Sequence, residues 1–196
     1  MGSVEGAGRI AQSRRSALKA DGMHRVSIGA GGSQPTRILA LGAHADDIEI
    51  GCGGTILRLL EQNPASEVCW VVMGASGRRR AEAVESASRF LANAKRKEII
   101  VKEFRDGYFP YMGAEIKDFF EELKRNSAPD LILTHYREDL HQDHRLVSEL
   151  TWNTYRNHLI LEYEIVKYDG DMGSPNFFVH LTESMVRKKI KVIMDS

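Results

Sequence analysis

The stretch Ile38-Leu39-Ala40-Leu41-Gly42-Ala43-His44-Ala45-Asp46-Asp47-Ile48-Glu49 decides which fold this sequence predicts. Its apolar start lies between Pro35 and a glycine, which is typical of a short strand that is buried on both faces. His44, Asp46 and Asp47 then follow at the carboxyl end of that strand, where open α/β sheets bind their ligands. An imidazole and two carboxylates beside a core are costly unless a cation lies between them, so we expect a divalent metal there.

The rest of the chain alternates between strand and helix patterns, which predicts one layered α/β domain with a mostly parallel sheet. Further strands are expected at residues 67–73, 98–104, 131–135, 163–168 and 177–180. Helices are expected at residues 56–63, 79–94, 115–124, 145–155 and 184–194. The run Gly51-Cys52-Gly53-Gly54 is expected to permit close helix packing, because the phosphate-binding fingerprint G-x-G-x-x-G is absent.

The composition excludes several classes of protein. The 196 residues, 42% of them hydrophobic and 28% charged, suit one globular domain, and no apolar run reaches the roughly 18 residues that span a bilayer. Because 27 basic residues balance 27 acidic ones, we expect a small-molecule partner and no nucleic acid. The two cysteines, Cys52 and Cys69, form no disulfide framework, which predicts a cytoplasmic, reducing location.

The first 35 residues differ from the rest of the chain. They are rich in glycine, serine and arginine and have no hydrophobic periodicity, so we expect a disordered leader at residues 1–35 and the folded domain at residues 36–196. A further hypothesis places the natural start of the chain at Met23.

A second polar cluster, His141-Gln142-Asp143-His144, follows the strand expected at residues 131–135. If the cluster begins the next helix, His141 and His144 lie on the same face because they are three positions apart. Both clusters would then lie at the carboxyl ends of strands of the same sheet.

Together the two clusters offer the ligands of a catalytic zinc site. Such sites use three protein ligands, and imidazole with carboxylate suits zinc or another first-row divalent metal. His44, His144 and one of Asp46 and Asp47 would make this set. Zinc lowers the pKa of a bound water to about 7, and a neighbouring carboxylate accepts its proton during attack on a carbonyl.

The groups that do not bind the metal are expected to move protons and stabilise charge. The second aspartate of the first cluster would act as a base, and a protonated His141 would stabilise the oxyanion. Asp143 would keep His141 charged and oriented. Hydrolysis of an unactivated amide needs this combination.

The segment 43–49, the glycine run after it and the segment 141–144 resemble the motifs of the PIG-L/LmbE family of metal-dependent N-deacetylases. The resemblance extends from Arg37 to the C-terminus and implies a single Rossmann-like domain. It also implies removal of the acetyl group from an N-acetylglucosamine-type sugar or sugar conjugate. The family usually has proline where this chain has Ala45, a position that supplies no ligand.

The resemblance also implies roles for individual residues. His44, Asp47 and His144 would bind the zinc ion. Asp46 would be the general base, and His141 would stabilise the oxyanion and protonate the leaving amine.

Four further positions match the family less specifically or are expected to have structural roles. Arg79 and Asp106 loosely match positions at which the family binds substrate. Glu49 is expected to brace the first loop, and His135 to be a satisfied core histidine. Family members usually continue past the place where this sequence stops, so the resemblance leaves open that the chain is truncated.

Three alternatives remain open from the sequence alone. A phosphoacceptor module similar to a response-regulator receiver would use the paired aspartates for magnesium, with Asp106, Thr134 and Lys167 after later strands. A sugar-binding relative would hold the metal without turnover. Within the enzyme class, the amide could belong to a thiol conjugate or a peptide-like linkage.

Overall fold

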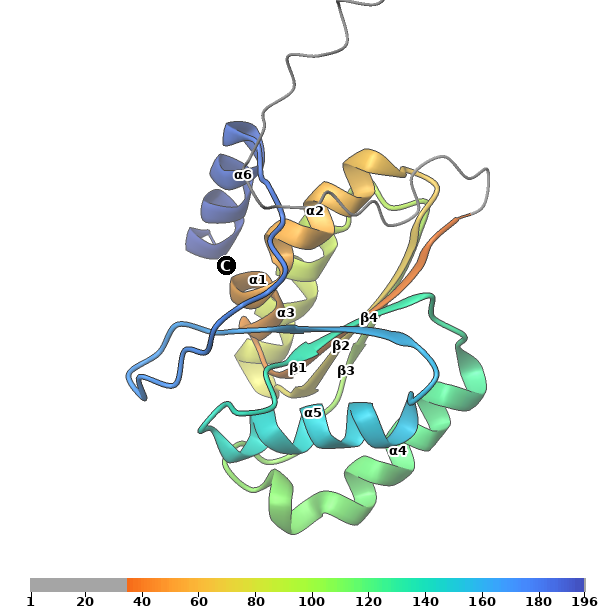
Figure 1. Ribbon diagram of the computed structural model, residues 1–196, viewed down its shortest axis with the longest axis vertical. Coiled ribbons are helices and arrows are strands. Elements are labelled where there is room, and N and C mark those ends of the chain that lie inside the picture. Colours follow the sequence, from red (N-terminus) through yellow and green to blue (C-terminus); the bar gives the residue numbers. More distant parts are fainter. Residues whose placement is uncertain (1–34, 196) are drawn as a thin grey trace, which may run out of the picture.

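Five parallel strands form the centre of the molecule in the computed structural model, which describes residues 35–195 (Figure 1). The strands are β1 (Arg37–His44), β2 (Glu67–Gly74), β3 (Arg96–Val101), β4 (Leu131–His135) and β5 (Leu159–Tyr163). Their order in the sheet is β3-β2-β1-β4-β5. The chain runs from β1 to β3 toward one edge and then from β4 to β5 toward the other, so the strand order reverses between β1 and β4. This arrangement confirms the expected Rossmann-like α/β domain. It differs from the 2-1-3-4-5 order of receivers and so argues against the phosphoacceptor alternative.

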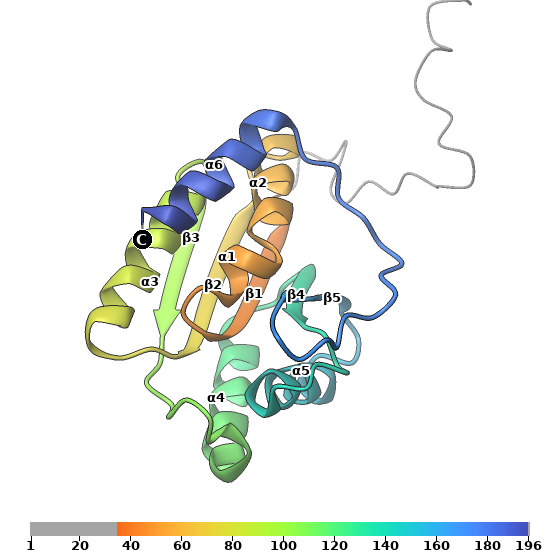
Figure 2. The ribbon, with the colours of Figure 1, turned by 90° about the vertical axis from the view of Figure 1, so that its left-hand side faces the viewer.

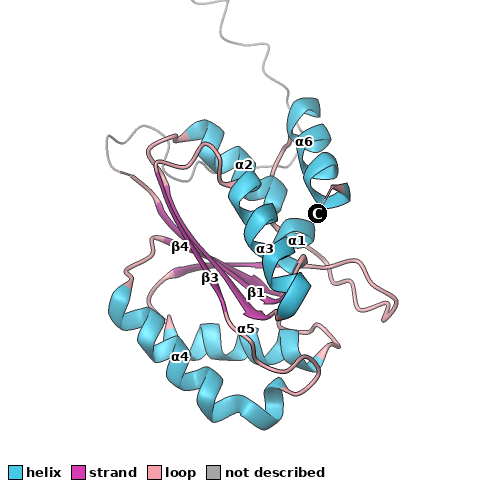
Figure 3. Ribbon diagram, turned by 180° about the vertical axis from the view of Figure 1, so that it is seen from behind, coloured by secondary structure: helices cyan, strands magenta, loops and turns pink. Residues whose placement is uncertain are grey.

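Helices cover both faces of the sheet (Figures 1 and 2). The helical elements are α1 (Asp47–Gly51), α2 (Gly53–Gln62), α3 (Gly77–Phe90), the 3-10 helix η1 (Phe109–Met112), α4 (Gly113–Asn126), α5 (Gln142–Thr154) and α6 (Glu183–Met194). One face carries α1, α2, α3 and α6, and the other carries η1, α4 and α5, as the view from behind also shows (Figure 3). The sheet is therefore the middle of three layers.

Residues 38–43 of the central strand β1 are apolar and buried, which is typical of a strand whose two faces are both covered. Its side chains alternate between two hydrophobic cores. Ile38 and Ala40 face the core under α1, α2, α3 and α6, whereas Leu39 and Leu41 face the core under α4 and α5. Because β1 has apolar side chains on both faces, it is stable only in the middle of the sheet, where both faces are covered.

The glycine run after β1 permits close packing, as the sequence predicted. A Cβ atom at Gly53 would lie 2.7 Å from the ring of Phe90 on α3, and one at Gly51 would lie still closer to the ring of Tyr163. Both approaches are too close for a side chain. The two glycines thus allow α1 and α2 to approach α3 and the end of β5.

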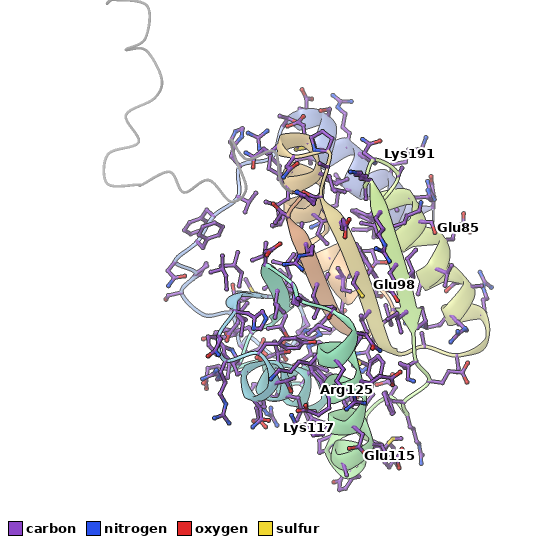
Figure 4. The ribbon with its side chains drawn as sticks, turned by 90° about the vertical axis from the view of Figure 1, so that its right-hand side faces the viewer. Glu85, Glu98, Glu115, Lys117, Arg125 and Lys191 are labelled. Carbon is purple, nitrogen blue, oxygen red and sulfur yellow. The ribbon has the colours of Figure 1, made fainter. Side chains whose placement is uncertain are left out.

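The outer edge strand β3 begins with charged residues. Arg96, Lys97 and Glu98 are exposed, and Figure 4 shows Glu98 on this edge of the sheet. Charged side chains on an edge strand hinder its pairing with another chain. The strand begins two residues earlier than the sequence predicted and ends at Val101 rather than at residue 104.

The strands expected at residues 163–168 and 177–180 are wrong. The fifth strand instead spans Leu159–Tyr163, where its apolar residues pair with β4 in register from Leu131 to His135. After it, residues 164–182 contain no helix or strand. Val166 and Phe178 are 78% and 65% exposed, so these apolar residues gain no burial that would favour a sixth strand.

Two predictions concern parts of the chain at the limits of the structure. The leader expected at residues 1–35 lies almost wholly outside the described residues, and so does the proposed start at Met23. Among residues 35–195, no helix combines the length and the apolar character that crossing a bilayer requires.

Candidate metal centre

The two polar clusters meet at the carboxyl ends of β1 and β4. His44 is the last residue of β1, Asp47 is the first of α1, and His144 lies in the first turn of α5. Because β1 and β4 are neighbours, their following segments share one edge of the sheet. This edge is the crevice at the change of strand order, where α/β sheets bind ligands.

Three ligand atoms form a nearly regular triangle. His144 Nε2 lies 3.3 Å from His44 Nδ1, and Asp47 Oδ2 lies 3.5 Å from each of these nitrogens. Ligand atoms placed 2.0 to 2.1 Å from a tetrahedral zinc ion lie about 3.3 Å from one another. The spacing and the chemistry of these residues therefore fit a zinc or similar divalent ion.

The backbone at Asp46 is strained. Its φ is 87°, and it is the only non-glycine residue of positive φ among residues 35–195. A side chain in this conformation costs of the order of 1–3 kcal/mol and is often found at functional sites. The turn separates neighbouring carboxylates, because Asp47 is buried whereas Asp46 is exposed beside the ligand triangle.

The carboxylates of Asp46 and Asp47 have opposite pKa shifts. Partial shielding of its carboxylate from water, together with the charge of Asp47, raises the pKa of Asp46. Burial alone would raise the pKa of Asp47 too, but the imidazoles of His135, His44 and His144 hold that pKa well below its usual range. Asp47 is thus suited to bind a cation, and Asp46 to exchange a proton.

The neighbouring histidines also have shifted pKa values. Burial opposes the charged form of His44, but Asp47 and Asp143 outweigh this effect and raise its pKa to about 9. Burial lowers the pKa of His135 to about 4 and also lowers the pKa of His141. The surroundings of His44 therefore favour a positive charge next to Asp47. A bound metal cation would supply that charge in place of a protonated ring.

Carboxylates orient the second nitrogen of each candidate histidine ligand. His44 Nε2 lies 3.0 Å from Asp143 Oδ2 and 3.1 Å from Asp106 Oδ1. His144 Nδ1 lies 3.0 Å from Asp139 Oδ2. Carboxylates in this position fix the tautomer and the ring orientation of metal-binding histidines.

The carboxylate of Asp143 orients His44, whereas its expected role in keeping His141 charged and oriented stays a prediction. The buried carboxylate of Asp143 lies beside His44 and accepts hydrogen bonds from the backbone N–H groups of Gly107, at 2.6 Å, and Phe109, at 3.1 Å. From the first turn of α5 it therefore braces His44 and the loop before η1. The sequence could not indicate this, because the loop follows a different strand.

His141 forms the N-cap of α5. Its Nδ1 accepts a hydrogen bond from the backbone N–H of Asp143 at 3.2 Å, so a neutral ring carries its proton on Nε2. The ring stacks on His144 with centroids 4.5 Å apart and meets His44 edge-on at 4.9 Å. His141 thus lies against both candidate histidine ligands with an Nε2–H group to donate.

The two residues that matched substrate-binding positions lie near the centre. Asp106 has a side chain 76% exposed, although Oδ1 lies beside His44. Arg79 is exposed in the first turn of α3, and its charge partly offsets the rise in the pKa of Asp46. Both can therefore contact a molecule that approaches the metal centre from solvent.

Sequence reasoning missed Asp139 and underestimated His135. His135 is fully buried, as expected, but its Nδ1 has no hydrogen-bond partner among residues 35–195, so it is not a satisfied histidine. Its Nε2 lies 3.3 Å from Asp47 Oδ2, and its ring stacks on His144 at 4.0 Å. Asp139 was missed because it lies in an irregular loop. The two-residue spacing from Asp139 to His141 was a usable signal. Asp139 Oδ1 accepts the His141 backbone N–H at 2.8 Å, and aspartate favours turns closed by this kind of hydrogen bond.

Glu49 is a buried residue of α1, and its expected role in bracing the first loop stays a prediction. It is 2% exposed, and burial raises its pKa to about 7.

A separate cavity of about 550 Å³ lies between β5 and residues 172–179, and none of the candidate metal ligands lines it.

Three solved structures of proteins with different described activities have a fold similar to that of this chain. The N,N'-diacetylchitobiose deacetylase of Pyrococcus horikoshii is 24% identical, over 81% of this chain and 68% of its own, with a TM-score of 0.60. The zinc-inhibited form of the teicoplanin deacetylase Orf2 is 14% identical, over 81% and 83%, with a TM-score of 0.66. GalB, a 4-carboxy-2-hydroxymuconate hydratase from Pseudomonas putida KT2440, is 18% identical, over 81% and 77%, with a TM-score of 0.57. At these identities the likeness establishes the fold and not the reaction.

A family comparison is more specific. Residues 39–155 match the PIG-L family, which is described as GlcNAc-PI de-N-acetylase. The match includes both polar clusters and confirms the resemblance that their motifs indicated. Since it spans more than half of the 196 residues, the chain belongs to the PIG-L family.

Proposed function

We propose that this protein is a zinc-dependent hydrolase that removes the acetyl group from an N-acetylglucosamine-type sugar or sugar conjugate. The observation that carries the proposal is the triangle formed by His44, Asp47 and His144 at the change of strand order. Membership of the PIG-L family supports the deacetylase chemistry. The deacetylases with the same fold support it further.

The metal would be held by His44 Nδ1, Asp47 Oδ2 and His144 Nε2. When bound, zinc supplies a Lewis acid that polarises an amide carbonyl and acidifies water. Asp143 and Asp139 keep the two imidazoles in the orientation that binding needs.

Asp46 is the proposed general base. The Asp46 side chain is exposed, its carboxylate interacts electrostatically with His44 and His144, and its raised pKa suits proton exchange. It accepts a proton from the water that adds to the carbonyl carbon of the acetamide. That proton is then available to the nitrogen when the C–N bond breaks, so the products are acetate and the free amine.

His141 is the proposed oxyanion donor. Its Nδ1 is occupied by the α5 backbone, so its Nε2–H is free to donate to the tetrahedral oxyanion. A neutral donor agrees with its lowered pKa and replaces the charged histidine that the sequence suggested. The family resemblance also implied that His141 protonates the leaving amine, but in this scheme Asp46 supplies that proton, because a neutral imidazole is too weak an acid to do so.

The substrate is proposed to be a small N-acetylated sugar that contacts Asp106 and Arg79. Asp106 offers a carboxylate to sugar hydroxyl groups, and Arg79 offers a hydrogen-bond donor. The free thiols of Cys52 and Cys69 agree with the proposed cytoplasmic location.

The experiment that tests this function combines zinc analysis with acetate release. N-acetyl hexosamines, nucleotide sugars, lipid-linked sugars and N-acetylated thiol conjugates are incubated with the zinc-loaded protein, and acetate and free amine are both measured. We expect one bound zinc and equal amounts of the two products. Sugar binding without acetate would favour the non-catalytic relative, and release from thiol conjugates alone would favour the other amide class.

A further inference from the structure

A buried group of charges lies behind the candidate metal ligand His144. Asp139, Lys167 and Asp171 have side chains that are 3%, 16% and 6% exposed. Lys167 Nζ lies 3.0 Å from Asp139 Oδ1 and also forms an ion pair with Asp171. Asp139 Oδ2 in turn lies 3.0 Å from His144 Nδ1. A continuous line of contacts therefore joins the segment after β5 to the metal centre.

Each oxygen of Asp139 has a separate function in this group. Oδ2 contacts the His144 ring, whereas Oδ1 contacts Lys167 and accepts the backbone N–H of His141. The two sets of contacts fix the rotation of the carboxylate. Among residues 35–195, Lys167 is the only lysine or arginine that forms an ion pair with the Asp139 carboxylate, because Arg145 contacts only the Asp139 backbone carbonyl.

The same segment also holds the loop in front of α5. Asp171 accepts the backbone N–H of Leu140 at 2.7 Å. Residues 139–141 are thus fixed from one side by Lys167 and Asp171, and from the other by the start of α5. The residues between β5 and α6 therefore support the metal centre, although none of them is a candidate ligand.

We propose that Lys167 is a positioning residue of the metal centre, which holds Asp139 against His144 and so increases the affinity of the protein for zinc. The inference rests on the proposed function, because it concerns the same metal. A nearly buried carboxylate is costly without a partner cation. If Lys167 is removed, Asp139 loses this partner and no longer fixes the His144 ring with the same precision.

The consequence is measured as zinc affinity. Removal of a carboxylate that orients a metal-binding histidine typically weakens metal affinity by about 10- to 100-fold. Lys167 acts one contact further away, so we expect Lys167→Met to weaken zinc binding by about 10-fold, at the lower end of this range. Lys167→Arg keeps the charge and is expected to restore most of the affinity.

The experiment uses the full chain and a coloured chelator that competes for zinc. Wild type, Lys167→Met, Lys167→Gln and Lys167→Arg are compared, and Lys124→Met is the matched control. Lys124 on α4 also bonds a buried part of the fold, the Thr154 carbonyl at 2.7 Å, and this carbonyl is at the opposite end of α5 from His144. Unfolding of the metal-free proteins is recorded, so that lost stability is separated from lost zinc affinity.

The expected pattern is weaker zinc binding in the Met and Gln variants, near-normal binding in the Arg variant and no change in the control. If Lys167→Met does not fold, Lys167→Gln carries the same test with a smaller change of shape. Zinc affinity of the Met or Gln variant within twofold of wild type would overturn this inference alone. A wild-type protein that binds no zinc would overturn the proposed function as well.

Discussion

His144 Nε2 lies 3.3 Å from His44 Nδ1, although 100 positions separate the two residues in the chain. They meet because β1 and β4 are neighbours in the sheet and each is followed at its carboxyl end by a polar segment. Asp47 completes the triangle from the first residue of α1. A single exchange in the strand order would separate these atoms, so the fold and the candidate site depend on the same topology.

The first prediction concerns the ligand triangle. His144→Ala is expected to remove tight zinc binding and acetate release together, because two remaining protein ligands do not make a stable zinc site. Zinc content after dialysis is the measurement. His180→Ala removes an exposed histidine and should retain one zinc per chain. If His144→Ala retained zinc as tightly as wild type, His144 would not be a ligand.

The second prediction separates metal binding from proton transfer. Asp46→Asn is expected to keep the zinc and to lower kcat by about 100- to 10,000-fold, the usual contribution of a general base. The amide keeps the shape of the side chain but cannot accept the proton. Zinc content and the rate of acetate release are measured on the same sample. A fully active variant would show that another group is the base.

The third prediction tests the backbone strain at Asp46. Glycine adopts a φ of 87° without strain, whereas alanine does not. Asp46→Gly is therefore expected to be more stable to unfolding than Asp46→Ala by about 1 kcal/mol, although both should be inactive. Denaturant unfolding of the metal-free proteins measures the difference. Equal stabilities would indicate that the turn holds no strain.

The fourth prediction tests the contacts of Asp143 with His44 and with the loop before η1. Asp143→Asn places an amide where two backbone N–H groups and His44 need an acceptor, so we expect a loss of about 1–3 kcal/mol of stability and weaker zinc binding. Glu149→Gln, on the exposed side of the same helix, is the control. A loss of turnover with unchanged stability and zinc affinity would instead favour a direct role in catalysis.

The fifth prediction concerns acid stability. Hydrogen bonds and charge from Arg37 lower the pKa of Asp130 in the folded protein, so the pair stabilises the fold above the ordinary carboxyl pKa. This contribution is lost as the pH falls through the lowered pKa. Because both side chains are about half exposed, Asp130→Asn should cost about 1 kcal/mol or less at pH 7 and nothing at the acid limit.

Urea unfolding from pH 7 downwards checks this prediction. Glu85→Gln changes an exposed carboxylate on α3 that points into solvent, and it should leave the profile unchanged (Figure 4). A difference between wild type and Asp130→Asn that stays constant down to the acid limit would contradict the account of the pair.

The sequence predicted the parts of the molecule that depend on local patterns. The apolar run before His44 and the five residues of β4 are buried on both faces, so their composition identified them as strands. The edge strand β5 was misplaced by four residues at its start, because Val166 and Tyr168 are apolar or aromatic but exposed. Hydrophobicity alone does not distinguish an edge strand from such a segment.

The site was predictable where a motif is contiguous and not where it depends on contacts between loops. His44, Asp47 and His144 were found from two short motifs. The contacts of Asp143 with the backbone near Gly107 and of Asp139 with Lys167 join segments that follow different strands. Their partners are fixed only when the sheet is assembled, so spacing in the sequence could not indicate them.

The account is tested most directly by crystals of the zinc-loaded protein measured on both sides of the zinc absorption edge. It predicts one anomalous peak per chain, bound by His44 Nδ1, Asp47 Oδ2 and His144 Nε2 at about 2.0 to 2.2 Å. Zinc bound elsewhere on the chain, with these three atoms left apart from it, would contradict the central claim.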